Sequence, residues 1–218
     1  MMTSALTEFR RDGFTEIPAF IPASQVRALQ TSADDLITSF TERGYRSEDF
    51  WFFERPSGDA PVLYRVHNLE RQGSPVIASL FAGGPLHGLA ADILGAPVRS
   101  TACAMIVKLP YVAAAVPWHR DRTSVPAHTV CNLSVFLDRS ADNGCLEFVA
   151  GSHLLPDGAD VAAVSGAGPA TAVPAQAGDV VVHDVRAVHG SRPNGTATIR
   201  RSIVIEFAPA GLSLPRDG

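Results

Sequence analysis

The sequence predicts a mainly β fold with α-helices gathered in its N-terminal part. Apolar residues recur at helical spacing in the first forty residues, and short apolar runs separated by turn residues about every 8–12 positions follow residue 97. The chain has 218 residues, 46% of them hydrophobic, which is enough to fill one core. We therefore expect one domain over residues 1–218, helical to about residue 97, with an antiparallel sandwich or barrel from about 98 to 210.

Two helices and a strand are expected in the first forty residues. A short helix ends at Asp12-Gly13, and residues 14–17 then alternate as in a strand. A second helix begins at Pro22, or at Ser24 acting as its cap. One face of this helix is apolar, through Val26, Leu29, Ala33, Leu36, Ile37 and Phe40.

The next segment, residues 43–75, is rich in aromatic and charged side chains and has no clean period. We interpret it as a long ordered connection with some strand, of the kind that often contacts a substrate. A third helix is expected from Pro85 to Leu94, because Gly95 is typical of a helix C-terminus and Pro97 cannot continue the helix.

Beyond residue 98 the expected strands are short apolar runs between turn residues. They cover residues 102–109, 129–137, 146–149, 180–182 and 199–207. Residues 154–176 are rich in Ala, Gly and Pro, so we expect a long loop there and the most mobile part of the chain.

The last strand has two different faces. Alternation places Arg200, Ser202, Val204 and Glu206 on one side and Arg201, Ile203, Ile205 and Phe207 on the other. The polar side suits the interior of a barrel that holds a polar ligand. Arg201 points the other way, and we expect it to make an ion pair on the outer surface.

Composition narrows the class of function. A net charge of −4 argues against nucleic acid as a partner, and the chain shows neither a basic, apolar leader nor an apolar run approaching 18 residues. Cys103, Cys131 and Cys145 are widely spaced without a CxxC pair, which favours reduced thiols in a cytoplasmic protein. The oligomeric state is not readable from the sequence.

Four residues carry the strongest chemical signal. His119 and Asp121 lie two apart, so on an extended segment their side chains share one side. With a distant His189 they supply two imidazoles and a carboxylate, the ligand set that holds Fe(II) and leaves three positions open. Arg200, eleven residues beyond His189, is placed to clamp the carboxylate of an iron-bound co-substrate. His183 is the alternative third ligand.

Five ordered segments of the chain resemble the phytanoyl-CoA dioxygenase family, a branch of the Fe(II)/2-oxoglutarate-dependent oxygenases. They are Trp118-His119-Arg120-Asp121, residues 143–153, residues 178–183, His189-Gly190-Ser191-Arg192-Pro193-Asn194, and Arg200. The resemblance implies a double-stranded β-helix (jelly-roll, cupin-like) core flanked by N-terminal helices. It also favours His189 over His183 as a ligand, because Gly190-Ser191 and Asn194 follow His189 as they do in the family.

The resemblance implies roles for further residues. His119, Asp121 and His189 would bind Fe(II), and replacing His183 should largely spare the metal. Arg200 would bind the far carboxylate of 2-oxoglutarate, and three residues are expected nearby: Ser202, Lys108 and Asn132. For the substrate we nominate Trp118, Arg122, Tyr64, Arg65 and His67.

The implied activity is oxidation, most simply hydroxylation, of a small molecule by O2, with release of succinate and CO2. Halogenases of this superfamily carry a small residue where this chain has Asp121, so halogenation is not expected. Desaturation, cyclisation, epoxidation and stereoinversion use the same residues and are not separated by the sequence. A cupin-like metal-dependent isomerase or hydrolase is the alternative, but it would not need Arg200 at that spacing. Small size and composition are compatible with a substrate that is a specialised metabolite, a lipid-derived acid or an amino-acid derivative.

Overall fold

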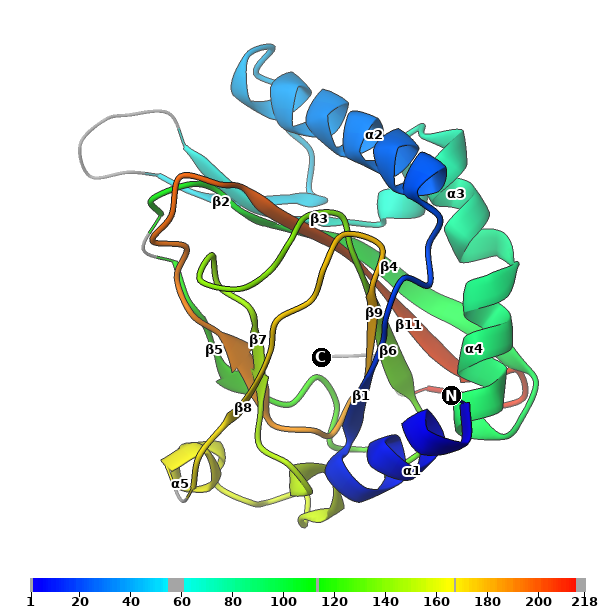
Figure 1. Ribbon diagram of the computed structural model, residues 1–218. Coiled ribbons are helices and arrows are strands. Elements are labelled where there is room, and N and C mark those ends of the chain that lie inside the picture. Colours follow the sequence, from blue (N-terminus) through cyan, green and yellow to red (C-terminus); the bar gives the residue numbers. More distant parts are fainter. Residues whose placement is uncertain (1, 55–60, 113, 167, 215–218) are drawn as a thin grey trace.

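Two antiparallel β-sheets form the centre of the computed structural model, which describes residues 2–54, 61–112, 114–166 and 168–214 (Figure 1). The larger sheet has the order β1 (Phe14–Ile17), β9 (Val180–Asp184), β6 (Cys131–Phe136), β11 (Arg200–Pro209), β4 (Val98–Lys108), β3 (Val62–His67) and β2 (Phe50–Phe53). The smaller sheet has the order β5 (Val116–His119), β10 (His189–Ser191), β7 (Leu146–Phe148) and β8 (Thr171–Val173). This is the expected mainly β, jelly-roll arrangement.

Helices cover the outer face of the larger sheet (Figure 1). They are α1 (Met2–Asp12), α2 (Ala23–Thr41), α3 (Pro75–Ala82) and α4 (Pro85–Leu94), with a short 3-10 turn η1 (Leu69–Arg71) before α3. The main core lies between these helices and the sheet, where Leu29 of α2 and Leu89 of α4 share a cluster with Ile203 and Ile205 of β11. Burial of each such side chain contributes roughly 1.5–3 kcal/mol, so this layer fixes the orientation of β11.

The alternation of β11 therefore appears as expected. Ile203, Ile205 and Phe207 are fully buried against the helices, while Arg200, Ser202, Val204 and Glu206 line a cavity on the other face. A smaller cluster that includes Phe136, Phe148 and Val181 fills the space between the two sheets beside that cavity.

Several expected elements are confirmed with close bounds. The Pro85–Leu94 helix ends at Gly95, whose φ of 69° is the left-handed conformation that glycine adopts easily. Pro22 is the N-cap residue of α2, and no side chain caps that helix, so Ser24 is not its cap.

Other expectations were wrong. The segment 154–176 is not one long loop, because it contains the last residue of η2 (Ser152–Leu154), helix α5 (Val161–Gly166) and strand β8. Helix α3 was missed. The strand expected at residues 14–17 is confirmed as β1, and β2 and β3 are the strands of the segment 43–75; all three belong to the larger sheet.

The segment Pro75–Leu94 has the length and the apolar composition of a membrane-spanning helix. In the fold, however, this segment is α3 and α4, with Gly83 and Gly84 between them. Ile77, Leu80, Leu86, Leu89 and Ile93 belong to the main core, so the apolar character is that of helices packed on a sheet.

Candidate metal centre

The pairing of β5 with β10 brings together two histidines that lie 70 positions apart in the sequence. His119 and His189 are direct cross-strand partners, and their ring centroids are 4.3 Å apart. Gly190 lets the strands come this close, because a Cβ at that position would lie 2.9 Å from the carbonyl oxygen of Val116. The sheet itself therefore sets the spacing of the two imidazoles.

The backbone fixes which ring nitrogen of each histidine is free. The Nδ1 atom of His119 is 2.8 Å from the carbonyl oxygen of Pro117, and that of His189 is 3.0 Å from the carbonyl oxygen of Ala187. A carbonyl only accepts, so each Nδ1 carries the proton and donates it. Each Nε2 is left with its lone pair available, as a metal ligand requires.

Asp121 completes the centre from the turn after β5. Its amide and that of Arg122 both donate to the carbonyl oxygen of Val185, which ties this turn to the end of β9. Its Oδ1 atom lies 3.3 Å from Nε2 of His119, and its Oδ2 atom lies 3.7 Å from Nε2 of His189. The ligand atoms of these three residues all lie within 4.8 Å of one another.

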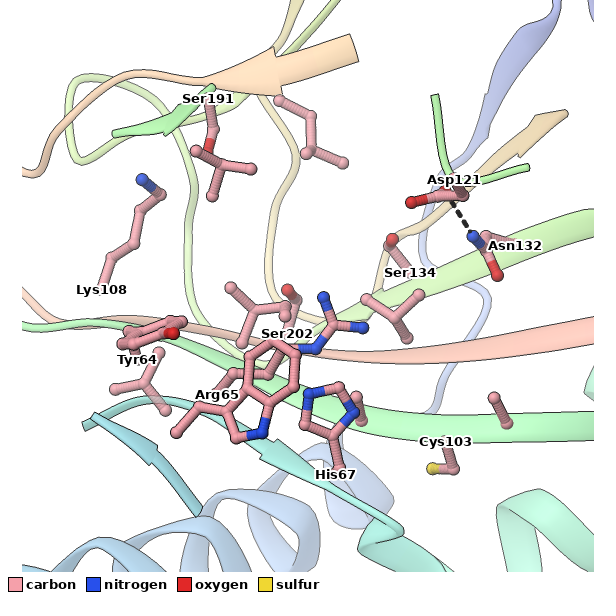
Figure 2. A pocket seen from close by; sticks show the side chains of 18 of the residues that line it. Tyr64, Arg65, His67, Cys103, Lys108, Asp121, Asn132, Ser134, Ser191 and Ser202 are labelled. Carbon is pink, nitrogen blue, oxygen red and sulfur yellow. Dashed lines mark hydrogen bonds between the residues drawn. The ribbon is translucent and has the colours of Figure 1, made fainter. Parts of the chain in front are cut away.

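His183 is a neighbour of Asp121 and not a fourth corner of this group. Its Nε2 lies 3.1 Å from Oδ2 of Asp121, and the side-chain amide of Asn132 donates to the same oxygen at 2.7 Å. Asn132 and His183 are direct partners on adjacent strands, so they approach the carboxylate together. Replacing His183 was expected largely to spare the metal, but its contact with Asp121 gives it a position from which it orients a ligand. Asn132 likewise lines the cavity but donates to Asp121 (Figure 2).

The ionisation states suit a divalent cation. Burial alone would raise the pKa of Asp121, but His189, His119 and His183 around it hold that pKa well below its ordinary value. Burial lowers the pKa of His189 to about 3, against the opposing effect of Asp121, so this imidazole is neutral. An ionised carboxylate beside neutral imidazole is the donor set that Fe(II) takes, and the three residues fit that metal.

A cavity of about 770 Å³ opens beside the triad and is lined by both sheets (Figure 2). Most of the residues nominated from the sequence line it: Tyr64, Arg65, His67, Lys108, His119, Asp121, Arg122, Asn132, His189, Arg200 and Ser202. Trp118 is the exception, because it is not among the described residues that form the wall although Pro117 and His119 on either side of it are. Its place next to the metal motif in sequence was a poor guide, since strand neighbours point to opposite faces.

One end of the cavity is a cationic pocket centred on Arg200. This side chain is 1% exposed, and its Nε has no hydrogen-bond partner among the described residues. Its guanidinium carbon lies 4.9 Å from the centroid of the Phe136 ring, and burial lowers its pKa to about 10. A buried guanidinium with an unsatisfied donor is what a distal carboxylate of 2-oxoglutarate would complete, so the residues fit this co-substrate as well.

Lys108 is the cross-strand partner of Arg200 and lines the same end. Its ammonium donates to the carbonyl oxygens of Arg192 at 2.7 Å and Ala114 at 3.1 Å, and burial followed by the charge of Arg200 lowers its pKa to about 8. Ser191 was missed from the sequence. Its buried hydroxyl also lacks a partner among the described residues, and its position two residues after His189 on the same strand was the signal that could have found it.

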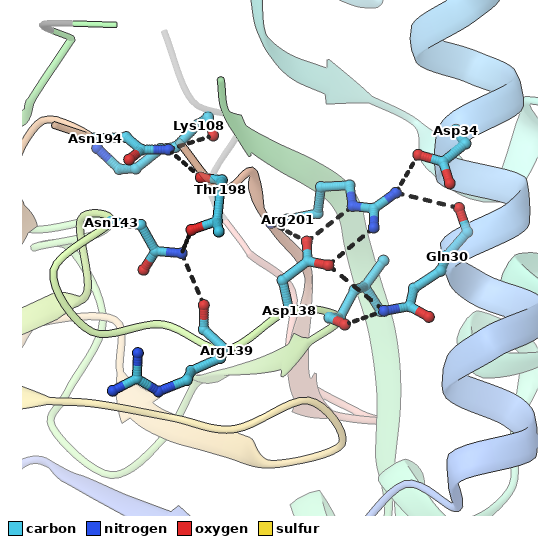
Figure 3. Close-up of polar contacts among 10 residues, drawn as sticks. Gln30, Asp34, Lys108, Asp138, Arg139, Asn143, Asn194, Thr198 and Arg201 are labelled. Carbon is cyan, nitrogen blue, oxygen red and sulfur yellow. Dashed lines mark hydrogen bonds and ion pairs between the residues drawn. The ribbon is translucent and has the colours of Figure 1, made fainter. Parts of the chain in front are cut away.

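Arg201 faces away from the cavity as expected, but its ion pair is not on the outer surface (Figure 3). Its guanidinium contacts both carboxylate oxygens of Asp138, at 2.8 and 2.9 Å, and also Asp34 of α2. The helix covers this cluster, and the Arg201 side chain is 6% exposed.

At the opposite end of the polar face of β11, Glu206 forms an ion pair with Arg122. The Arg122 Nε lies 2.8 Å from Oε2 of Glu206, and the hydroxyl of Thr101 donates to Oε1 at 2.6 Å. Arg122 therefore reaches the wall of the cavity with its charge matched by a carboxylate.

Comparisons with known proteins agree with this geometry. The family model described as phytanoyl-CoA dioxygenase matches residues 9–202. The crystal structure of AviO1 from Streptomyces viridochromogenes Tue57 is 50% identical and superposes with a TM-score of 0.94, covering 99% of this chain and 98% of that one. A probable alpha-ketoglutarate-dependent hypophosphite dioxygenase of Stutzerimonas stutzeri is 26% identical, over 96% of this chain and 79% of its own.

A third relative was solved with its ligands. It is the epimerase SnoN from nogalamycin biosynthesis, in complex with Fe3+, alpha ketoglutarate and nogalamycin RO, at 25% identity and a TM-score of 0.78, covering 100% of this chain and 91% of that one. The family match spans most of the chain. The Stutzerimonas relative is named as alpha-ketoglutarate-dependent, and the SnoN structure contains Fe3+ and alpha ketoglutarate. The chain belongs to the phytanoyl-CoA dioxygenase family of Fe(II)/2-oxoglutarate-dependent oxygenases.

Proposed function

We propose that this protein oxidises a small molecule of specialised metabolism in the cytoplasm, with Fe(II) held by His119, Asp121 and His189. The observation that carries the proposal is the joint placement of three metal donors and a buried, unsatisfied Arg200 on the wall of one cavity. An isomerase or hydrolase of the cupin type would have no use for such a costly buried cation.

The proposed roles divide the cavity into two parts. Arg200, with Lys108, Ser191 and Ser202, binds the distal carboxylate of 2-oxoglutarate by charge-assisted hydrogen bonds. Bound iron supplies the activation of O2, coupled to conversion of 2-oxoglutarate to succinate and CO2. Asn132 holds Asp121 in position by donating to its Oδ2 atom, while Oδ1 lies beside Nε2 of His119.

The remaining wall receives the substrate. At about 770 Å³ the cavity falls within the range of small-molecule sites and leaves room beside a dicarboxylate. The bound nogalamycin compound in the SnoN structure and the name of the Stutzerimonas relative support small substrates in general. Hydroxylation is the simplest outcome, and stereoinversion is the second candidate because SnoN is described as an epimerase.

The first test is an anaerobic titration of the metal-free protein with Fe(II) and then 2-oxoglutarate. A weak visible charge-transfer band should appear in the wild type and be absent in Arg200→Gln at the same concentrations. Fe(II) binding without the band in the wild type would instead favour the cupin-like alternative. Succinate release with O2 consumption then provides the assay for screening substrates.

A further inference from the structure

The charges around the cavity are matched in most places. Arg122 is paired with Glu206, and Arg71 lies 3.2 Å from Glu70. Under the proposed function, Asp121 faces the metal and the cations of the Arg200 end face the co-substrate. Among the described cations that line the cavity, Arg65 of β3 has neither an acidic partner nor a part in binding the co-substrate.

The guanidinium of Arg65 makes no salt bridge or hydrogen bond with a described residue, and its Nε is buried without a partner. The guanidinium carbon lies 5.9 Å from the centroid of the Trp51 ring, a contact that leaves the donors of the fork unused. Burial lowers the pKa of Arg65, with Asp121 acting in the opposite direction, yet a guanidinium stays charged at neutral pH. A half-buried cation whose Nε is shielded from water is costly unless a ligand supplies the opposite charge.

The position of Arg65 separates it from the co-substrate pocket and directs it at the substrate space. Its cross-strand partner on β4 is Ile106, which lies between it and Ser202 of β11. Figure 2 shows Arg65 and His67 pointing into the pocket from β3, with Asp121 across it. The guanidinium therefore reaches the space between the metal ligands and the edge of the larger sheet.

Two neighbours define what surrounds such a ligand. His67 lies two residues along the same face, its ring centroid is 4.1 Å from that of Trp51, and its Nε2 is buried without a partner among the described residues. Burial and then Arg65 lower the pKa of His67, so it offers a hydrogen bond without a second charge. Trp51, 47% exposed, and Tyr64 form an aromatic edge beside them.

We propose that the substrate carries a carboxylate or similar compact oxyanion that binds Arg65, with a flat or apolar part against Trp51. The inference rests on the proposed function for its account of the other charges. It adds a class of substrate: an anionic small molecule with an apolar body. The bidentate fork of arginine matches a carboxylate in geometry as well as charge.

Trp51 gives a direct readout, since the chain has only two tryptophans. In Trp118→Phe, Trp51 is the only tryptophan, and its emission can be followed while metal-free protein is titrated with benzoate or with benzamide, which has the same shape but no charge. We expect a saturable change with benzoate and at least tenfold weaker binding of benzamide. Phenyl phosphate, titrated alongside, distinguishes a carboxylate from a phosphate as the preferred group.

Matched variants locate the response. Arg65→Gln should abolish the preference for benzoate, and Arg65→Lys should keep part of it. Arg71→Gln is the control, because Arg71 lines the same cavity but already has Glu70 beside it. Equal binding of benzoate and benzamide, or a preference that survives Arg65→Gln, would overturn the proposal.

Benzoate could instead enter the co-substrate pocket, and two further measurements detect this. If the preference is lost in Arg200→Gln, or if 2-oxoglutarate with Zn(II) displaces benzoate, the probe sits at Arg200 and the inference is wrong. The titration needs neither iron nor turnover. Failure of the charge-transfer band would therefore reject the oxygenase role separately from this result.

Discussion

Replacing Arg200 by methionine should make the metal-free protein more stable while removing its affinity for 2-oxoglutarate. Burial lowers the pKa of Arg200 to about 10 from an ordinary value of roughly 12.5, and each pKa unit corresponds to 1.36 kcal/mol. The charged form is therefore disfavoured by about 3 kcal/mol in the fold. Methionine avoids this cost but loses the contact with Phe136, which contributes about 1–2 kcal/mol.

The net gain is about 1–2 kcal/mol, and for a domain of this size each kcal/mol shifts Tm upward by roughly 2–4 °C. Because the pKa of Arg200 is lower in the folded state than in the unfolded state, the cost is fully present below about pH 10 and disappears only as the pH rises beyond it. The difference in Tm between wild type and variant should therefore be constant from about pH 6 to pH 9.

The measurement is thermal unfolding of metal-free protein followed by circular dichroism, with Arg201→Met as the matched control. Arg201 is also buried and lies on the same strand, but Asp138 raises its pKa and both carboxylate oxygens of Asp138 accept from it. Its loss leaves Asp138 unpaired and should cost about 3 kcal/mol or more. If Arg200→Met loses stability as Arg201→Met does, the Arg200 guanidinium is already satisfied and the reasoning fails.

Three further predictions concern the metal and the co-substrate. His183→Leu should weaken Fe(II) binding by about 10–100-fold without abolishing it, because an orienting group and not a ligand is lost; equilibrium dialysis measures this, and unchanged affinity would deny His183 that role. Lys108 has a pKa lowered to about 8, so its positive charge is present below that pH and lost above it. The affinity for 2-oxoglutarate should then fall between pH 7 and pH 9 in the wild type, and calorimetry on Lys108→Met should find little change over that interval. Gly190→Ala places a Cβ 2.9 Å from the carbonyl oxygen of Val116 and should separate the two ligand strands, reducing Fe(II) affinity at least tenfold. Gly195→Ala, with nothing within 4 Å of the added atom, should bind Fe(II) as the wild type does.

The sequence was most informative where local chemistry and tertiary structure agree. Alternation along residues 199–207 correctly separated a polar face from a core face, because β11 lies between a helical layer and a cavity. The end of α4 at Gly95 was predicted equally well, since the left-handed conformation that follows a helix is a local requirement.

The sequence was least informative where contacts between distant residues determine the structure. No local pattern marks β8, whose three residues are held by pairing with β7. The α3 helix did carry a local start signal that was missed, because Ser74 caps it by accepting from the amide of Ile77 and Pro75 lies in its first turn. Trp118 was misplaced because closeness in sequence to the metal motif was taken as closeness in space. Arg201 was expected at the surface because the sequence does not reveal that α2 lies over it.

The position of β11 in its sheet has a consequence for how such enzymes diverge. This strand is hydrogen-bonded on both sides, to β4 and to β6, and a slip of one residue would bring Arg201 into the cavity and turn Arg200 toward the helices. A slip of the register by one residue would therefore remove Arg200 from the co-substrate pocket in a single step. By contrast β2, at the edge of the sheet with a bulge between Trp51 and Phe52, is paired with β3 alone in the described part of the chain. Descendants of one ancestor can exchange residues there, next to Arg65, and acquire new substrates while the oxidising half of the site stays as it was.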